Sequence, residues 1–348
     1  MNHIFRNIWN PSTGTCVATC EHASAHRAAA SSTSVFGAVP SGTALAAGVS
    51  VGAWRLLPLA VMLAWGGMAV ATPQGGTVSA GSASITQGAG QMTITQTTPH
   101  VAINWQSFGI GAGQSVQFVQ PGRSAVALNR VTGADPSAIL GRLSANGQVF
   151  LVNPNGILFG SGASVDVGGL VASTLNISDA DFMAGRYRFM GSAATELMNQ
   201  GALQATSGGY VALLGASVSN QGQIDTRGGN AFLGAADTIK VPVSSTGRIK
   251  LELSPSRINA AVANGKTGTI VTEGGQVYMQ AASLSTMVAS IIQSGSIDTT
   301  GSQGGAVHLL TDGGDIKVDG RITANSMAAQ NKGGDIVIGR DEESGVLA

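Results

Sequence analysis

Residues that could carry out chemistry are few in this sequence, and they lie far apart. Of its five histidines, only His100 and His308 lie beyond the first 71 residues. A metal site or a catalytic base usually draws on clustered histidines, cysteines or carboxylates. We therefore interpret both histidines as surface residues, and we predict no metal site and no cofactor.

Two short motifs resemble known chemical signatures but lack the surroundings that those signatures need. Residues 265–267 (GKT) have Ala260 where a phosphate-binding loop places its first glycine. Residues 48–52 (GVSVG) have the spacing of a nucleophile elbow, but no strand–turn–helix pattern encloses them. We interpret both matches as chance.

Four aspartates near the C-terminus are the remaining candidates for catalysis: Asp298, Asp312, Asp315 and Asp319. They could converge on one face, as the paired carboxylates of glycosidases do, or they could line solvated corners of the chain. We favour the solvated corners and predict that the chain is not an enzyme.

Composition narrows the class of protein further. Lys+Arg and Asp+Glu number 18 each, so no basic excess is available to bind nucleic acid phosphates. Disorder is disfavoured because only 10% of residues are charged and 43% are hydrophobic. The 50 glycines follow no three-residue period, which excludes collagen.

The first 71 residues have the layout of a leader for export. Arg55 precedes an uncharged apolar run at residues 56–65, and Ala69-Val70-Ala71 follows it. This order predicts a signal peptide that is cleaved between Ala71 and Thr72. A retained transmembrane helix is not expected, because a span needs about 20 apolar residues. Both cysteines, Cys16 and Cys20, lie in the leader, so the exported part would contain none.

Beyond the leader, short strand-favouring runs alternate with glycine, asparagine and serine, which indicates an all-β protein. One helix-like stretch, residues 180–185, is too short to change that interpretation. In the second half, six double glycines each precede an alternating strand. Aliphatic residues follow two and four positions after the second glycine: Val211/Leu213, Ala231/Leu233, Val277/Met279, Val307/Leu309, Ile316/Val318 and Ile336/Ile338.

Because alternate side chains of a strand face opposite sides, this pattern places aliphatic residues on one side only. We expect the residues between them to be unconstrained: Ala212, Phe232, Tyr278, His308, Lys317 and Val337. A repeat of this kind predicts a right-handed parallel β-helix, in which stacked coils build a continuous core. A sandwich would show no such repeat, and propeller blades repeat at about 40 residues or more.

Several motifs, taken in order, resemble one family. The first 22 residues are similar to the extended signal peptide region of large autotransporters and two-partner-secretion exoproteins. The body resembles the secretion domain of filamentous haemagglutinin and its two-partner-secretion relatives. The family-like positions include Asn104, Trp105, Phe108, Asn129 and Arg130, and the motif Asn153, Pro154, Asn155, Gly156 and Ile157. The family's second, NPNL-type motif is absent, which leaves the subtype open.

The resemblance implies an adhesin-like exoprotein of a Gram-negative bacterium. It would cross the periplasm, pass an outer-membrane β-barrel transporter with periplasmic receptor domains, and end secreted or at the cell surface. Host or bacterial cell surfaces are the candidate targets, and nucleic acid is not. The alternatives are the delivery portion of a contact-dependent inhibition toxin or haemolysin, and a protein that acquires haem or haemopexin.

Two features of the family-like region have more than one interpretation. Residues 153–156 read as a tight turn, in which proline presets φ, asparagine accepts a left-handed backbone and glycine accepts any conformation. That turn could simply shape a coil corner, or, as the resemblance implies, assist recognition or folding at the transporter. Arg130 is either a partly buried cation that needs acceptors or a solvated strand residue.

The expected domains are the removed extended signal peptide at 1–71, the secretion domain at 72–300, and further coils at 301–348. Strand residues 336–338 end ten residues before the C-terminus, and the remainder is too short for another coil. We therefore expect the chain to be a shortened version or a fragment of a longer filament.

The leader gives the first testable prediction. N-terminal sequencing of the exported protein is expected to begin at Thr72, because the small residues Ala69 and Ala71 satisfy a signal peptidase. Replacing both alanines with tryptophan should leave the precursor uncleaved. A mature chain that begins before Leu56 would contradict this assignment.

Overall fold

The computed structural model describes residues 5–10, 15–20, 72–192, 194–241, 251–256, 259–284 and 288–340. The chain divides into two units, Met1–Trp65 and Gly66–Ala348. In the first unit, β1 (Phe5–Asn10) pairs antiparallel with β2 (Thr15–Cys20). Ala69 and Ala71 of the predicted cleavage site lie outside the described residues, whereas Thr72 lies within them.

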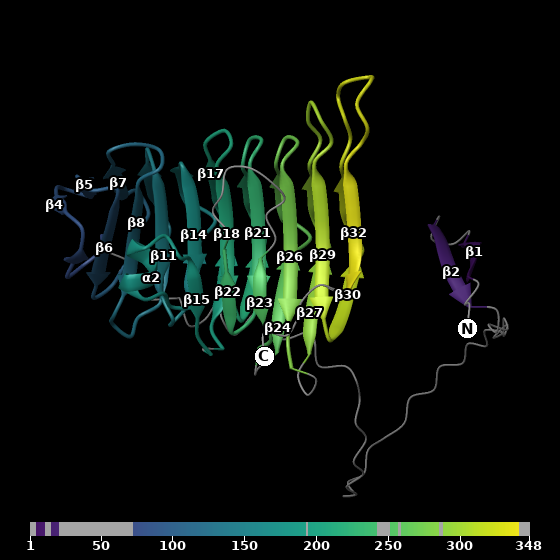
Figure 1. Ribbon diagram of the computed structural model, residues 1–348, viewed down its shortest axis with the longest axis horizontal. Coiled ribbons are helices and arrows are strands. Elements are labelled where there is room, and N and C mark those ends of the chain that lie inside the picture. The colour runs from purple at the N-terminus through teal and green to yellow at the C-terminus, as the bar shows by residue number, and fades with distance from the viewer. Residues whose placement is uncertain are drawn as a thin grey trace, which may run out of the picture. The chain divides into compact units, whose positions relative to one another are not determined.

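The second unit is a parallel β-helix, as the repeat predicted, with three sheets that the chain visits in turn (Figure 1). The first sheet contains β4 (Ala83–Gln87), β5 (Gln91–Gln96), β7 (Ser115–Val119), β10 (Arg142–Ala145), β13 (Ser164–Val167), β17 (Ala202–Ala205), β20 (Gln223–Asp225), β25 (Thr269–Val271), β28 (Ser296–Asp298) and β31 (Arg321–Thr323). The second contains β3 (Thr77–Ala80), β6 (His100–Trp105), β8 (Val126–Val131), β11 (Gln148–Val152), β14 (Gly169–Ser173), β18 (Tyr210–Gly215), β21 (Asn230–Ala235), β26 (Gln276–Ala282), β29 (Ala306–Asp312) and β32 (Asp335–Arg340).

The third sheet contains β9 (Ser137–Ile139), β12 (Ile157–Phe159), β16 (Glu196–Asn199), β19 (Ser217–Asn220), β24 (Ala260–Asn264), β27 (Ala289–Gln293) and β30 (Gly314–Val318). Nearly all neighbours in the three sheets are parallel. The exceptions are at the N-terminal edge, where β3 lies antiparallel to β6 and β4 antiparallel to β5. These two strands cover the first coil, whose backbone groups would otherwise be unpaired.

Inside the solenoid, equivalent side chains stack from coil to coil. Val211, Ala231, Val277, Val307 and Ile336 occupy one register position of the second sheet, as the spacing predicted. The first four are fully buried, whereas Ile336 and its neighbour in the next row, Ile338, are 47% and 50% exposed on the last described strand. The aliphatic positions were therefore predicted correctly from their spacing after each double glycine.

Each double glycine has two different structural roles. At the corner between the first and second sheets, the first glycine takes a left-handed backbone, with φ of +73° at Gly208 and +82° at Gly228. The second glycine allows coils to approach closely, since a Cβ on Gly229 would lie 1.7 Å from the oxygen of Gly209. The pair at 313–314 differs from the others, because it leads into β30 of the third sheet.

A ladder of buried amides runs through the solenoid along the third sheet. Asn199 Nδ2 donates to Asn220 Oδ1 at 2.8 Å, and Asn220 Nδ2 donates to Asn264 Oδ1 at 2.8 Å. Asn264 Nδ2 then donates to Gln293 Oε1 at 2.9 Å. All four side chains are fully buried, so each depends on its neighbours for hydrogen bonds.

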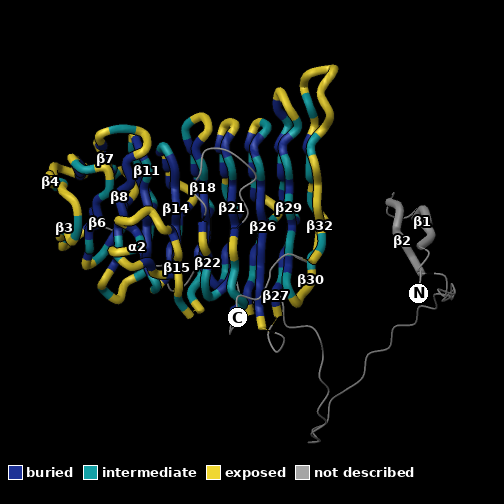
Figure 2. Tube along the Cα trace, viewed as in Figure 1, coloured by how far each residue is buried: buried dark blue, intermediate teal, exposed yellow. Residues whose placement is uncertain are grey.

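The outward side of the second sheet carries a second apolar core, which the sequence analysis did not anticipate (Figure 2). It is covered by α2 (Asp179–Met183), β15 (Arg188–Met190), β22 (Thr238–Lys240) and β23 (Glu252–Ser254). We call the described residues 174–192, 236–241 and 251–256 the strap. Its three strands form an antiparallel sheet in the order β15–β22–β23.

The strap shows that the prediction of an unconstrained outward side was wrong for three residues. Ala212, Phe232 and Tyr278 are buried in the second core. The stretch at 180–185, judged too short to matter, contributes to α2, whose Phe182 is also buried there. A period-two pattern shows which side of a strand faces the solenoid, but a cover built from distant segments leaves no such pattern.

Within the described residues, no helix has the length and apolar character that crossing a membrane requires.

The amide ladder gives the second prediction. Asn220→Ala should lower the free energy of unfolding by about 1–3 kcal/mol, because Asn199 Nδ2 and Asn264 Oδ1 lose a partner where water cannot replace it. Urea unfolding measures this difference. Ser219→Ala, on the adjacent half-exposed position, is the matched control and should change little. Equal stability of the two variants would contradict the role of the ladder.

Candidate functional site

The family-like motif forms a turn between two buried strands. Residues 153–156 join β11 to β12, and the Gly156 amide donates to the Asn153 carbonyl at 3.1 Å. Asn153 Oδ1 also accepts the Asn155 amide at 3.0 Å. The left-handed backbone belongs to Gly156, with φ of +113°, and not to Asn155 as the sequence analysis assigned it. A side chain at Gly156 would be strained there, and its Cβ would lie 3.3 Å from the Glu196 oxygen.

The turn is bonded to the coil before it and to the coil after it. Asn153 Nδ2 donates to the Asp135 carbonyl at 2.9 Å and to Ser137 Oγ at 3.0 Å. On the other side, Thr195 Oγ1 donates to the Pro154 carbonyl at 2.8 Å. The corner-shaping interpretation of the motif therefore has a direct structural basis.

Little of the motif reaches the surface of the folded chain. Asn153 and Ile157 are fully buried and Gly156 is buried, while Pro154 is half-buried and Asn155 is exposed. Asn155 Nδ2 donates to the Gly133 carbonyl at 2.8 Å, which holds this exposed side chain against the preceding coil. A partner that reads the folded motif therefore contacts Pro154 and Asn155.

Three further family-like residues meet inside the first coils. Trp105 packs edge-to-face against Phe108, with ring centroids 5.5 Å apart, and both rings are buried. Trp105 Nε1 donates to Asn129 Oδ1 at 3.0 Å, so the buried indole and the buried amide satisfy each other. Asn129 Nδ2 donates to the carbonyls of Ala127 and Phe150, both at 3.3 Å. These residues stabilise the solenoid interior and do not reach the surface.

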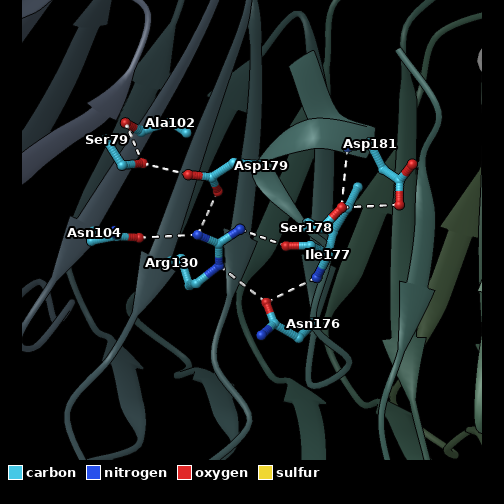
Figure 3. Close-up of polar contacts among 9 residues, drawn as sticks. All are labelled: Ser79, Ala102, Asn104, Arg130, Asn176, Ile177, Ser178, Asp179 and Asp181. Carbon is cyan, nitrogen blue, oxygen red and sulfur yellow. Dashed lines mark hydrogen bonds and ion pairs between the residues drawn. The ribbon is translucent and has the colours of Figure 1, made fainter. Parts of the chain in front are cut away.

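Arg130 proves to be the partly buried cation rather than the solvated residue (Figure 3). Its side chain is 14% exposed, and its Nη1 lies 2.6 Å from Asp179 Oδ1. It also donates from Nη1 to Asn104 Oδ1 at 3.1 Å and from Nε to Asn176 Oδ1 at 3.0 Å. A fourth bond joins Nη2 to the Ile177 carbonyl. Arg130 therefore holds the beginning of the strap on the second sheet.

Neither histidine is the free surface residue that the sequence analysis expected. His100 is half-buried beside the strap, with Nε2 3.3 Å from the Tyr187 hydroxyl oxygen, and its ring packs edge-to-face against Phe182. His308 stacks flat on Tyr278, with ring centroids 4.5 Å apart. Both positions follow from the second core.

The four aspartates point to no shared catalytic arrangement. Asp312 lies 3.5 Å from Arg340 Nη2, and Asp319 lies 3.2 Å from Lys317 Nζ. Asp298 Oδ1 accepts the Thr300 amide at 2.9 Å. Across the described ranges, no group of three or more histidines, cysteines and carboxylates is arranged to hold a metal ion.

Two family models match the sequence. A model described as the TPS secretion domain matches residues 69–338, and one described as the Extended Signal Peptide of Type V secretion system matches residues 1–50. Neither describes an enzyme family.

Named relatives come from Haemophilus influenzae. A heme/hemopexin-binding protein of strain Rd is 34% identical over 213 residues, which cover 58% of this chain and 22% of that protein. A second heme/hemopexin-binding protein is 43% identical over 94 residues, covering 27% of this chain and 10% of that protein. This chain thus spans about a fifth of the first relative's length.

A solved structure also resembles the chain. The secretion domain of HMW1 from Haemophilus influenzae aligns with a TM-score of 0.53 and 23% identity, over 76% of this chain and 96% of that chain. At this identity the likeness concerns the fold alone.

One carboxyl beside the turn gives the third prediction. Burial raises the pKa of Glu196 above its ordinary value of 4.5. The folded chain thus binds that proton more tightly than the unfolded chain, and the contribution to stability is lost as the pH rises through the raised pKa. Glu196→Gln should raise the melting temperature at pH 7 by about 1–2 °C and leave it unchanged at pH 4. A larger gain at pH 4 than at pH 7 would contradict the sign.

Proposed function

The chain belongs to the family of TPS secretion domains, and on that basis we propose that it is an adhesin-like exoprotein of the two-partner-secretion pathway. The observation that carries this proposal is the family match over residues 69–338, which spans the described solenoid. The protein is secreted and exported through the periplasm, since the extended signal peptide precedes the secretion domain. A secretion domain of this kind implies an outer-membrane transporter as its partner.

In this proposal the transporter's periplasmic receptor domains bind the early coils while these are still extended. Adding a strand to an exposed sheet edge is a common way to recognise an extended segment. The turn at residues 153–156 contributes twice: it shapes the corner once the chain folds, and its exposed Pro154 and Asn155 form part of the recognised surface. The domain limits 1–71, 72–300 and 301–348 belong to the same proposal.

After export the chain binds a cell surface and catalyses no reaction. A second candidate, haem or haemopexin acquisition, is favoured by the relatives' names, heme/hemopexin-binding protein. The matched region is about a fifth of the first relative, so the candidate depends on whether that region carries the binding activity. Purified secreted chain can be tested against haem and haemopexin by calorimetry, beside an adhesion assay on cells.

Release into the medium gives the fourth prediction, and it separates recognition from corner shaping. Pro154→Ala removes the half-buried ring but leaves every side-chain bond of Asn153 and Asn155 in place. If the turn is recognised, co-expression with the transporter should give about tenfold less release for Pro154→Ala, with a nearly unchanged melting temperature.

Two further variants serve as controls. Gly156→Val should reduce both release and thermal stability, because φ of +113° and the nearby Glu196 oxygen disfavour a side chain. Asn230→Ala, far along the solenoid, should leave release unchanged. Signal peptide cleavage should proceed in all three. Normal release of Pro154→Ala would leave the turn with its structural role only.

A further inference from the structure

The strap is built from two segments that leave the solenoid at equivalent corners. The first follows β14 and contains α2 and β15, and the second follows β21 and contains β22 and β23. They meet only because β15 pairs antiparallel with β22, where Phe189 lies opposite Ile239. The chain must therefore complete β16 to β21 before the second segment exists to pair with the first.

Backbone hydrogen bonds attach the strap to the solenoid only at its roots. Thr174 N donates to Leu214 O, Ala236 N to Gly215 O and Ser256 N to Ala282 O. Among the described residues, β15, β22 and β23 form their ladder bonds with one another and with no strand of the solenoid. Lifting the strap would therefore leave the ladders between coils intact.

Side chains supply the rest of the attachment. Phe182, Phe189, Ile239 and Leu251 are at most 1% exposed, and they pack on the outward side of the second sheet. Leu251 rests on bare backbone, because a Cβ on Gly234 would lie 2.9 Å from its Cδ1. Such contacts are lost together when the cover lifts, whereas the aliphatic interior of the solenoid does not take part in them.

Polar contacts tie the first segment to the N-terminal end of the solenoid. Arg130 binds Asp179, Asn176 and the Ile177 carbonyl, and Ser79 Oγ donates to Asp179 Oδ2 at 2.8 Å (Figure 3). Ser79 belongs to β3, the strand that covers the first coil. The strap thus connects the N-terminal cover with coils formed much later in the chain.

We propose that the strap is a latch: it closes over the second sheet after the coils beneath it have formed, and it opens as a unit while those coils stay folded. Before closure, the outward residues Leu128, Phe150, Val171 and Phe232 form an open apolar face. Closure buries that face and locks the cap, the early coils and the strap into one body. Parts of a protein that share few contacts with the rest open separately in this way.

Two adjacent residues of β15 provide a matched test. Phe189 is fully buried against the second sheet, whereas Met190 beside it is 49% exposed. In purified secreted protein, Phe189→Asp should raise hydrogen exchange of the strap at least about tenfold, while β11 and β14 keep their protection. Met190→Asp should leave both regions as in the parent chain. Loss of protection in β11 and β14 together with the strap would overturn the proposal, as would an unchanged strap.

The order of closure is tested on the unmodified chain, so it does not depend on how the variants fold. Pulsed hydrogen exchange during refolding from urea should show β11, β14 and β18 protected before β15 and β22. Simultaneous protection, or a strap protected first, would overturn the proposal. Both measurements use purified protein, so their outcome is independent of export through a transporter.

Discussion

The backbone hydrogen bonds between successive coils are the constraint on which the rest of this structure depends. They place equivalent residues of neighbouring coils about 4.8 Å apart, so whatever stands at one position of a coil rests on its counterpart in the next. The approach is closest at the glycine corners, where a Cβ on Gly229 or Gly275 would lie 1.7 Å from the oxygen of the glycine below it. Those corners admit no side chain, and the double glycines mark the limits of the coils for this reason.

Stacking at this distance also decides which polar groups the interior can hold. An asparagine inside a solenoid is costly unless its amide is satisfied, and a second amide one coil away has the right separation to satisfy it. Asn199, Asn220, Asn264 and Gln293 form such a series. Aromatic rings follow the same rule on the outward side, where Phe232, Tyr278 and His308 stack in successive coils.

The secretion motif combines this regular lattice with a local exception. Residues 153–156 are held by bonds to both neighbouring coils, and only Pro154 and Asn155 reach the surface. A chain that is exported before it folds needs a corner that forms readily once the coils meet. Asparagine and glycine serve this purpose, since Asn153 bonds the turn internally and Gly156 takes the left-handed backbone. The absence of cysteine from the described part beyond residue 71 leaves folding to these non-covalent contacts.

The sequence by itself determined the repeat, the glycine corners and the aliphatic interior of this protein, because those features recur at fixed spacing and each coil contacts only its neighbours. It also located the turn, since asparagine, proline and glycine at consecutive positions have strong local backbone preferences. Only the tertiary structure decided what covers the outward side. Phe189 and Ile239 belong to segments whose contact depends on the whole stack of coils between them, and neither segment shows a period of its own. Arg130 had two interpretations for the same reason: its acceptors Asp179 and Asn176 lie on the strap, and pairing between segments so distant in the chain leaves no mark in local spacing.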